Sequence, residues 1–98
     1  MKLQKEVYKG SHPGEFLAKI LESKNYSKAH LARCVKDKPQ TLSSIINGKR
    51  RMNVKLSLKI EELFELEEGI LMTLQVFYDI KIIKVTNSHR SGSIFYVP

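Results

Sequence analysis

The chain has 98 residues, 42% of them hydrophobic, and a net charge of +7. This length suits one domain, and no apolar run approaches the roughly 20 residues of a membrane-spanning helix. The single cysteine, Cys34, excludes an intramolecular disulfide and fits a reducing cytoplasm. The three histidines are far apart in the sequence, which argues against a metal site, so we expect neither a metal nor a cofactor.

Positive charge is concentrated in the middle third of the chain. Residues 24–55 carry nine cations and one anion, whereas residues 56–83 carry two cations and six anions. This asymmetry predicts a face that binds a polyanion, centred on the middle segment. The alternative is a solvated basic surface without a partner.

The first third of the chain predicts one helix after an N-terminal arm. Residues 1–11 alternate only weakly between apolar and polar, and form either an arm or a short strand. From Pro13 the apolar spacing predicts an amphipathic helix that ends near Lys24, with Asn25 as its cap.

Two short helices follow, separated by a tight turn. Ser27 is a good N-cap for the first of them. Pro39 suits the first turn of the second, and Gly48 suits the position just past its end, which gives a helix over about residues 39–47. The break at residues 36–38 has the length of the turn in a helix-turn-helix.

The helix over residues 39–47 has two faces. Its apolar stripe is formed by Leu42, Ile45 and Ile46, and its polar stripe by Gln40, Ser43, Ser44 and Asn47. Amide and hydroxyl groups on such a stripe can face base edges in a DNA major groove, while flanking cations face phosphates. The alternative is a surface helix with an ordinary polar face.

The last part of the chain predicts two more helices. Asn53 can cap a fourth helix, whose exposed side would be formed by Glu61, Glu62 and Glu65. Residues 67–68 would then supply the acids in the first turn of a fifth helix that runs to about residue 79. The β-branched segment 80–85 either extends that helix or turns into a strand. Residues 84–98 form a C-terminal tail, whose apolar tip at 94–98 packs on its own domain or docks on a partner.

Three local motifs give the chain a resemblance to a known family. They are His12-Pro13-Gly14-Glu15, Ile46-Asn47-Gly48-Lys49-Arg50, and Leu74-Gln75 followed by Tyr78-Asp79-Ile80. In this order the chain resembles the HigA/VapI-type antitoxins of addiction modules, within the Cro/repressor-like (XRE) helix-turn-helix superfamily. The resemblance implies an all-α, five-helix DNA-binding domain over residues 12–83, and leaves a short strand or extended segment open at the C-terminal end.

The chain departs from this family mainly at the turn. Lys36 stands where a glycine is usual, which predicts a non-glycine residue in a strained conformation. Lys38 stands where a serine N-cap is usual, so a cap worth on the order of 1 kcal/mol is lost unless Asp37 replaces it. Residues 70–71 replace a common aromatic pair.

The resemblance also implies roles for individual residues. Lys28 would touch a phosphate, and the amide of Gln40 could bind adenine through N6 and N7. The remaining candidates for DNA contacts are Thr41, Ser43 and Ser44 on the helix, Asn47, Lys49 and Arg50 at its far end, and Lys38, which could contact either bases or phosphates. Specific binding calls for a homodimer on a two-fold operator, with Leu74, Phe77 and Tyr78 as the candidate interface. Alternatively, these three residues only close the monomer core.

We therefore expect a DNA-binding antitoxin that represses its own operon and neutralises an RNase toxin. A stand-alone repressor without a toxin, or a protein-interaction module on the same scaffold, are the alternatives. An enzyme is not expected, because Ser43, Ser44 and His30 do not amount to a catalytic triad.

Overall fold

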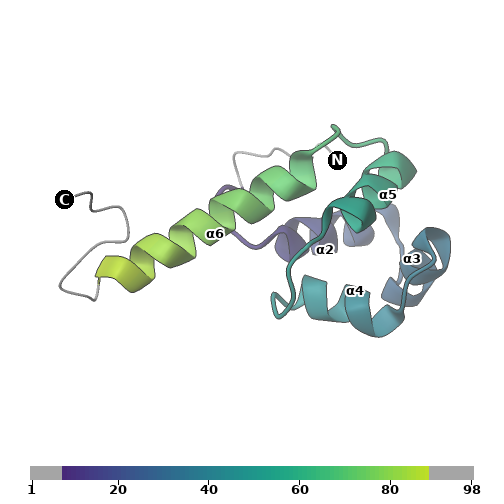
Figure 1. The fold of residues 1–98 in the computed structure, drawn as a ribbon. Helices are drawn as coiled ribbons and strands as arrows, with labels where there is room; N and C mark the ends of the chain where they lie inside the picture. The colour runs from purple at the N-terminus through teal and green to yellow at the C-terminus, as the bar shows by residue number, and fades with distance from the viewer. Residues whose placement is uncertain (1–7, 89–98) are drawn as a thin grey trace.

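The computed structural model describes residues 8–88, and these contain five complete α-helices (Figure 1). Their bounds are α2 Pro13–Lys24, α3 Lys28–Val35, α4 Pro39–Ile46, α5 Val54–Phe64 and α6 Ile70–Ser88. The predicted all-α, five-helix class is confirmed over this range. The predicted roles of residues 1–7 and of the apolar tip at 94–98 lie outside the described residues.

Several helix ends lie where the sequence predicts them. Ser27 Oγ accepts a hydrogen bond from the backbone N–H of His30 at 3.0 Å, and Asn53 Oδ1 accepts one from Leu56 at 2.8 Å. Asn25 closes α2 in the left-handed conformation, with φ of 58°. Gly48 follows α4 with φ of 76°. These local hydrogen bonds satisfy backbone groups that a helix end would otherwise leave unpaired.

The turn between α3 and α4 carries the strain that its sequence predicts. Lys36 adopts the left-handed conformation, with φ of 56°, where a glycine would be unstrained. Asp37 Oδ1 accepts a hydrogen bond from the N–H of Lys38 at 2.7 Å, which lies before α4 begins. No described side chain caps the first turn of α4. Asp37 therefore does not replace the missing serine cap.

The helices pack around one apolar core. α4 lies against α2 and α3, α3 lies against α5, and α6 lies against both α2 and α5. The fully buried side chains come from all five helices and include Phe16, Leu31, Leu42, Ile60 and Leu71. α4 is therefore held from two sides by its apolar stripe, which leaves its polar stripe outside.

Gly14 allows the start of α2 to lie directly against the end of α4. A Cβ atom placed on Gly14 would be 1.9 Å from the carbonyl oxygen of Ile45 and 2.8 Å from the Cα of Ile46. Backbone atoms cannot give way at such distances without moving the helix. The glycine of the His12-Pro13-Gly14-Glu15 motif is thus required by helix packing.

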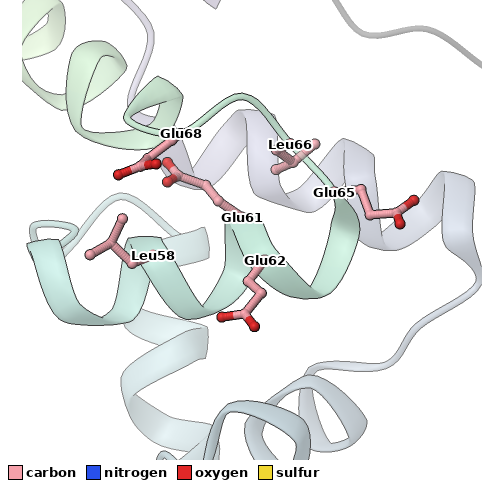
Figure 2. A pocket seen from close by; sticks show the side chains of 6 residues that line it. All are labelled: Leu58, Glu61, Glu62, Glu65, Leu66 and Glu68. Atoms are coloured by element: carbon pink, nitrogen blue, oxygen red, sulfur yellow. The ribbon is translucent and has the colours of Figure 1, made fainter.

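Glu61 is buried, which corrects the prediction that it lies on the exposed side of its helix. Its side chain is 3% exposed and points toward the turn before α6, whereas Glu62 and Glu65 point elsewhere (Figure 2). Its two carboxylate oxygens accept hydrogen bonds from the N–H groups of Gly69 and Leu71, both at 3.0 Å. An acid at a helix N-terminus is favourable, so Glu61 supplies the negative charge that was assigned to residues 67–68. Those two residues precede the helix.

α6 is longer than the sequence predicts. It continues as a helix of 19 residues to Ser88, so segment 80–85 extends it, and the expected start of the tail at residue 84 falls inside it. At about 1.5 Å per residue α6 is roughly 28 Å long, and its second half projects beyond the other helices (Figure 1). Exposed apolar side chains line this half, among them Ile80, Ile82 and Ile83.

Residues 8–11 pack onto the domain. The rings of Tyr8 and Phe16 meet edge to face with centroids 5.1 Å apart, and the N–H of Ser11 donates to the carbonyl of Tyr8 at 2.8 Å. This end of the predicted arm is therefore a helical turn and not a strand.

Candidate nucleic-acid interface

α4 presents most of its predicted polar stripe at the surface. Gln40 and Asn47 are exposed, and Ser43 and Ser44 are half-buried between them. Thr41 differs, because it is only 8% exposed. The residue after Gln40 is turned about 100° around the helix, toward the core, so Thr41 packs within the domain instead of joining the exposed stripe.

Cations lie at both ends of α4. Lys38 precedes α4, and Lys49 and Arg50 follow its end, while Lys28 lies at the start of the neighbouring helix α3. All four are exposed, and none of them forms an ion pair within residues 8–88. A polar stripe with free cations at both ends can face base edges and phosphates together.

The loop after α4, residues 48–53, is here called the basic loop, and α6 holds it in place. The Oε1 atom of Gln75 accepts a hydrogen bond from the backbone N–H of Met52 at 2.8 Å. The Nε2 atom of Gln75 donates to Asp79 at 3.0 Å, and Asp79 in turn pairs with the guanidinium of Arg51. Gln75, Asp79 and Arg51 are not among the predicted DNA contacts, although Gln75 and Asp79 belong to the motif Leu74-Gln75 followed by Tyr78-Asp79-Ile80.

His12 connects the start of α2 to the same loop. Its Nδ1 atom accepts a hydrogen bond from the N–H of Gly14 at 2.9 Å, and its ring meets that of Tyr78 edge to face at 5.0 Å. Burial lowers the pKa of His12 below its usual value, against the opposing effects of a backbone hydrogen bond with Arg50 and the charge of Asp79. The neutral imidazole therefore fits this position, since a protonated Nδ1 could not accept the hydrogen bond.

The carboxylate of Asp79 is stabilised in its charged form. Burial raises its pKa, but hydrogen bonds from Arg51 and Gln75 outweigh burial and leave the pKa below its usual value. Asp79 therefore remains charged at neutral pH and can hold Arg51.

The three residues of the candidate dimer interface do not share one surface. Leu74 is fully buried in the core, so it cannot contact a second chain, and its role is to close the monomer core. Phe77 is half-buried with the ammonium of Lys9 4.9 Å from its ring centroid. Tyr78 is half-buried against His12. The side chains one turn further along α6 are more exposed.

The described residues show neither a cluster of metal ligands nor a membrane-spanning helix. No group of three or more His, Cys, Asp or Glu side chains among them could hold a metal ion. No helix within residues 8–88 is both long and apolar enough to cross a membrane.

Comparison with known proteins gives similar structures but no match by sequence. No protein-family model and no curated protein matches the chain. A protein of Pseudomonas aeruginosa solved in complex with its operator DNA is 27% identical, with a TM-score of 0.75 over 79% of this chain and 86% of that one. An addiction-module antidote protein of the HigA family from Coxiella burnetii is 27% identical, with a TM-score of 0.75 over 82% and 88%.

The chain has the fold of the HigA-type antitoxins. A putative antidote protein of a plasmid maintenance system from Nostoc punctiforme agrees, at 25% identity and a TM-score of 0.74 over 79% of this chain and 85% of that one. The resemblance stated from three short motifs is thus confirmed by the whole HigA-type fold, including its helix-turn-helix.

The lowered pKa of His12 predicts a loss of stability in weak acid. As pH falls below about 6.5, the unfolded chain takes up a proton at this residue before the folded chain does, so the free energy of unfolding decreases until the folded pKa is passed. Replacing His12→Asn keeps an N-cap acceptor without a titrating group. Chemical denaturation at pH 7.5 and pH 5.5 gives the free energy of unfolding at each pH. Its decrease should be smaller for the variant than for the wild type, since both proteins share the other histidines. An equal decrease in both proteins would contradict this role.

Proposed function

We propose that this chain is a sequence-specific DNA-binding antitoxin that represses its own operon and neutralises a cognate RNase toxin. The observation that carries the DNA-binding part is the outer face of α4. Gln40, Ser43 and Ser44 lie on α4 and Asn47 caps its end, while the opposite side of the helix is fixed in the core. Unpaired cations precede and follow the helix. A rigid helix of this kind reads a few base edges while the cations fix its register on the phosphates.

The structural comparisons support the same assignment. One similar protein was solved with its operator DNA, and two others are described as antidote proteins of addiction or plasmid maintenance systems. Operator binding and an antidote role occur together in this fold, which supports autoregulation of an operon that also encodes a toxin.

Replacing Gln40 and replacing Lys49 should have different effects on DNA binding. Duplexes selected by the full chain from a randomised library give the preferred sequence, and fluorescence anisotropy over a salt series gives the affinity. Gln40→Ala should remove preference at one base position, at a cost of about 1–3 kcal/mol on the preferred duplex. Lys49→Gln should weaken binding to all duplexes alike and reduce the salt slope by about one unit.

Lys24→Gln is the matched control, because Lys24 is an exposed cation at the end of α2 and belongs neither to α4 nor to the basic loop. It should leave the base preference, the affinity and the salt slope unchanged. If the wild-type chain selects no sequence at all, the DNA-binding proposal is wrong and a protein-interaction module takes its place.

We also propose a homodimer that uses the projecting half of α6. One recognition helix contacts only a few base pairs, so specific binding calls for two copies on half-sites about one helical turn apart. Val76, Ile80 and Ile83 are 50%, 40% and 39% exposed and follow one another at i, i+4 and i+7, which places them on one face. This apolar face replaces Leu74 as the candidate interface.

Introducing charge on this face should break the dimer. The double variant Ile80→Glu with Ile83→Glu should sediment as a monomer at micromolar concentration, keep its helical circular dichroism, and bind the selected duplex at least about tenfold more weakly. Leu58→Glu adds an acid at an exposed apolar residue of α5 and should remain dimeric. A wild-type protein that sediments as a monomer, or a double variant that remains a dimer, would exclude this interface.

The toxin part of the proposal is tested by co-purification. The tagged full chain, isolated from its native host, should bring down one small protein in stoichiometric amount, identified by mass spectrometry. That protein should cleave mRNA by itself and lose this activity when the chain is added. Sequence-specific DNA binding without any such partner would instead indicate the alternative, a stand-alone repressor.

A further inference from the structure

The basic loop follows α4 but is tied to α6. Met52 is anchored twice, by its side chain in the core, which is 2% exposed, and by its N–H on Gln75. Arg51 is held through its guanidinium by Asp79. Together these contacts fix two consecutive residues of the loop on α6.

The loop cations divide into one that is held and two that are free. Arg51 is paired with Asp79, whereas Lys49 and Arg50 are exposed and form no ion pair among the described residues. The two free cations directly precede the two anchored residues. The N–H of Lys49 donates to the carbonyl of Ser44 at 2.9 Å, and the backbone of Arg50 forms a hydrogen bond with His12. The contacts of residues 51 and 52 with α6 hold the other end of this segment.

Gln75 is a polar residue at a core position. It is 1% exposed, where an apolar side chain would fill the space without needing polar partners. Its amide instead uses one end for the Met52 N–H and the other for Asp79. A buried amide with both ends engaged fixes the geometry of the groups that it joins.

We propose that Gln75 and Asp79 are positioning residues for DNA binding, which hold the basic loop so that Lys49 and Arg50 meet the phosphates without a further ordering step. This inference rests on the proposed function and deepens it. A loop ordered in advance loses less conformational entropy when it binds. Neither residue touches DNA in this assignment, and Arg51 acts as an anchor of the loop.

Asp79→Asn separates this positioning effect from simple electrostatics. The substitution removes an anion next to the basic loop, so long-range attraction by itself would strengthen DNA binding. Loss of the Arg51 anchor should instead weaken binding to the selected duplex by about five- to tenfold. The salt slope should stay the same, since no phosphate contact is lost, whereas Lys49→Gln reduces it by about one unit.

Gln75→Met is the second variant, because methionine fills a similar volume without an acceptor for the Met52 N–H. It should show the same loss of affinity at an unchanged slope, together with faster hydrogen exchange of the Met52 amide in the free protein. Phe64→Leu is the control for stability, since it disturbs the core in α5 and should leave both affinity and Met52 exchange as in the wild type.

The outcomes separate the two proposals. If the wild type selects a duplex but Asp79→Asn and Gln75→Met bind it as well as the wild type or better, the positioning role is wrong and the DNA-binding function stands. A salt slope reduced by one unit in either variant would also overturn the positioning role, because it would mean a lost phosphate contact. If the wild type selects no duplex, both proposals fall together.

Discussion

The close approach of α2 to the end of α4 determines how the candidate DNA-binding face is presented. It requires a residue without a side chain at position 14, because the carbonyl of Ile45 occupies the space of a Cβ atom. With α2 and α3 on its inner side, α4 can turn only one stripe outward. The same end of α2 carries His12, which joins the basic loop and α6. The packing of α4 and the position of the basic loop therefore both depend on the start of α2.

The charge distribution shows why this face is so strongly positive. Two acids of the acidic segment are used inside the molecule, Glu61 at the start of α6 and Asp79 on Arg51. Neither of them neutralises the cations at the two ends of α4. Lys38, Lys49 and Arg50 thus form no ion pair within the described residues, and only Arg51 of the basic loop is neutralised. The unpaired cations can attract a polyanion.

α6 serves two purposes along its length. Its first half completes the core and holds the basic loop through Gln75 and Asp79. Its second half is apolar on several sides and yet exposed, with Ile82 at 43%. Contiguous exposed apolar side chains are typical of an interaction surface, and here they lie beside the exposed Lys81 and Lys84. A partner on it would lie close to the residues that anchor Arg51.

The sequence by itself determined the number of helices, most of their ends and the class of the fold, but not the extent of α6. Ser27, Asn53 and Gly48 act through hydrogen bonds and dihedral angles within a few residues, so local sequence is sufficient for them. It also determined the polar stripe of α4, since helical periodicity is a local property. Only the tertiary structure decided that Thr41, Glu61 and Leu74 are buried, and that α6 anchors the basic loop. Those features depend on which distant element lies opposite a side chain, and the spacing of residues along one helix does not contain that information.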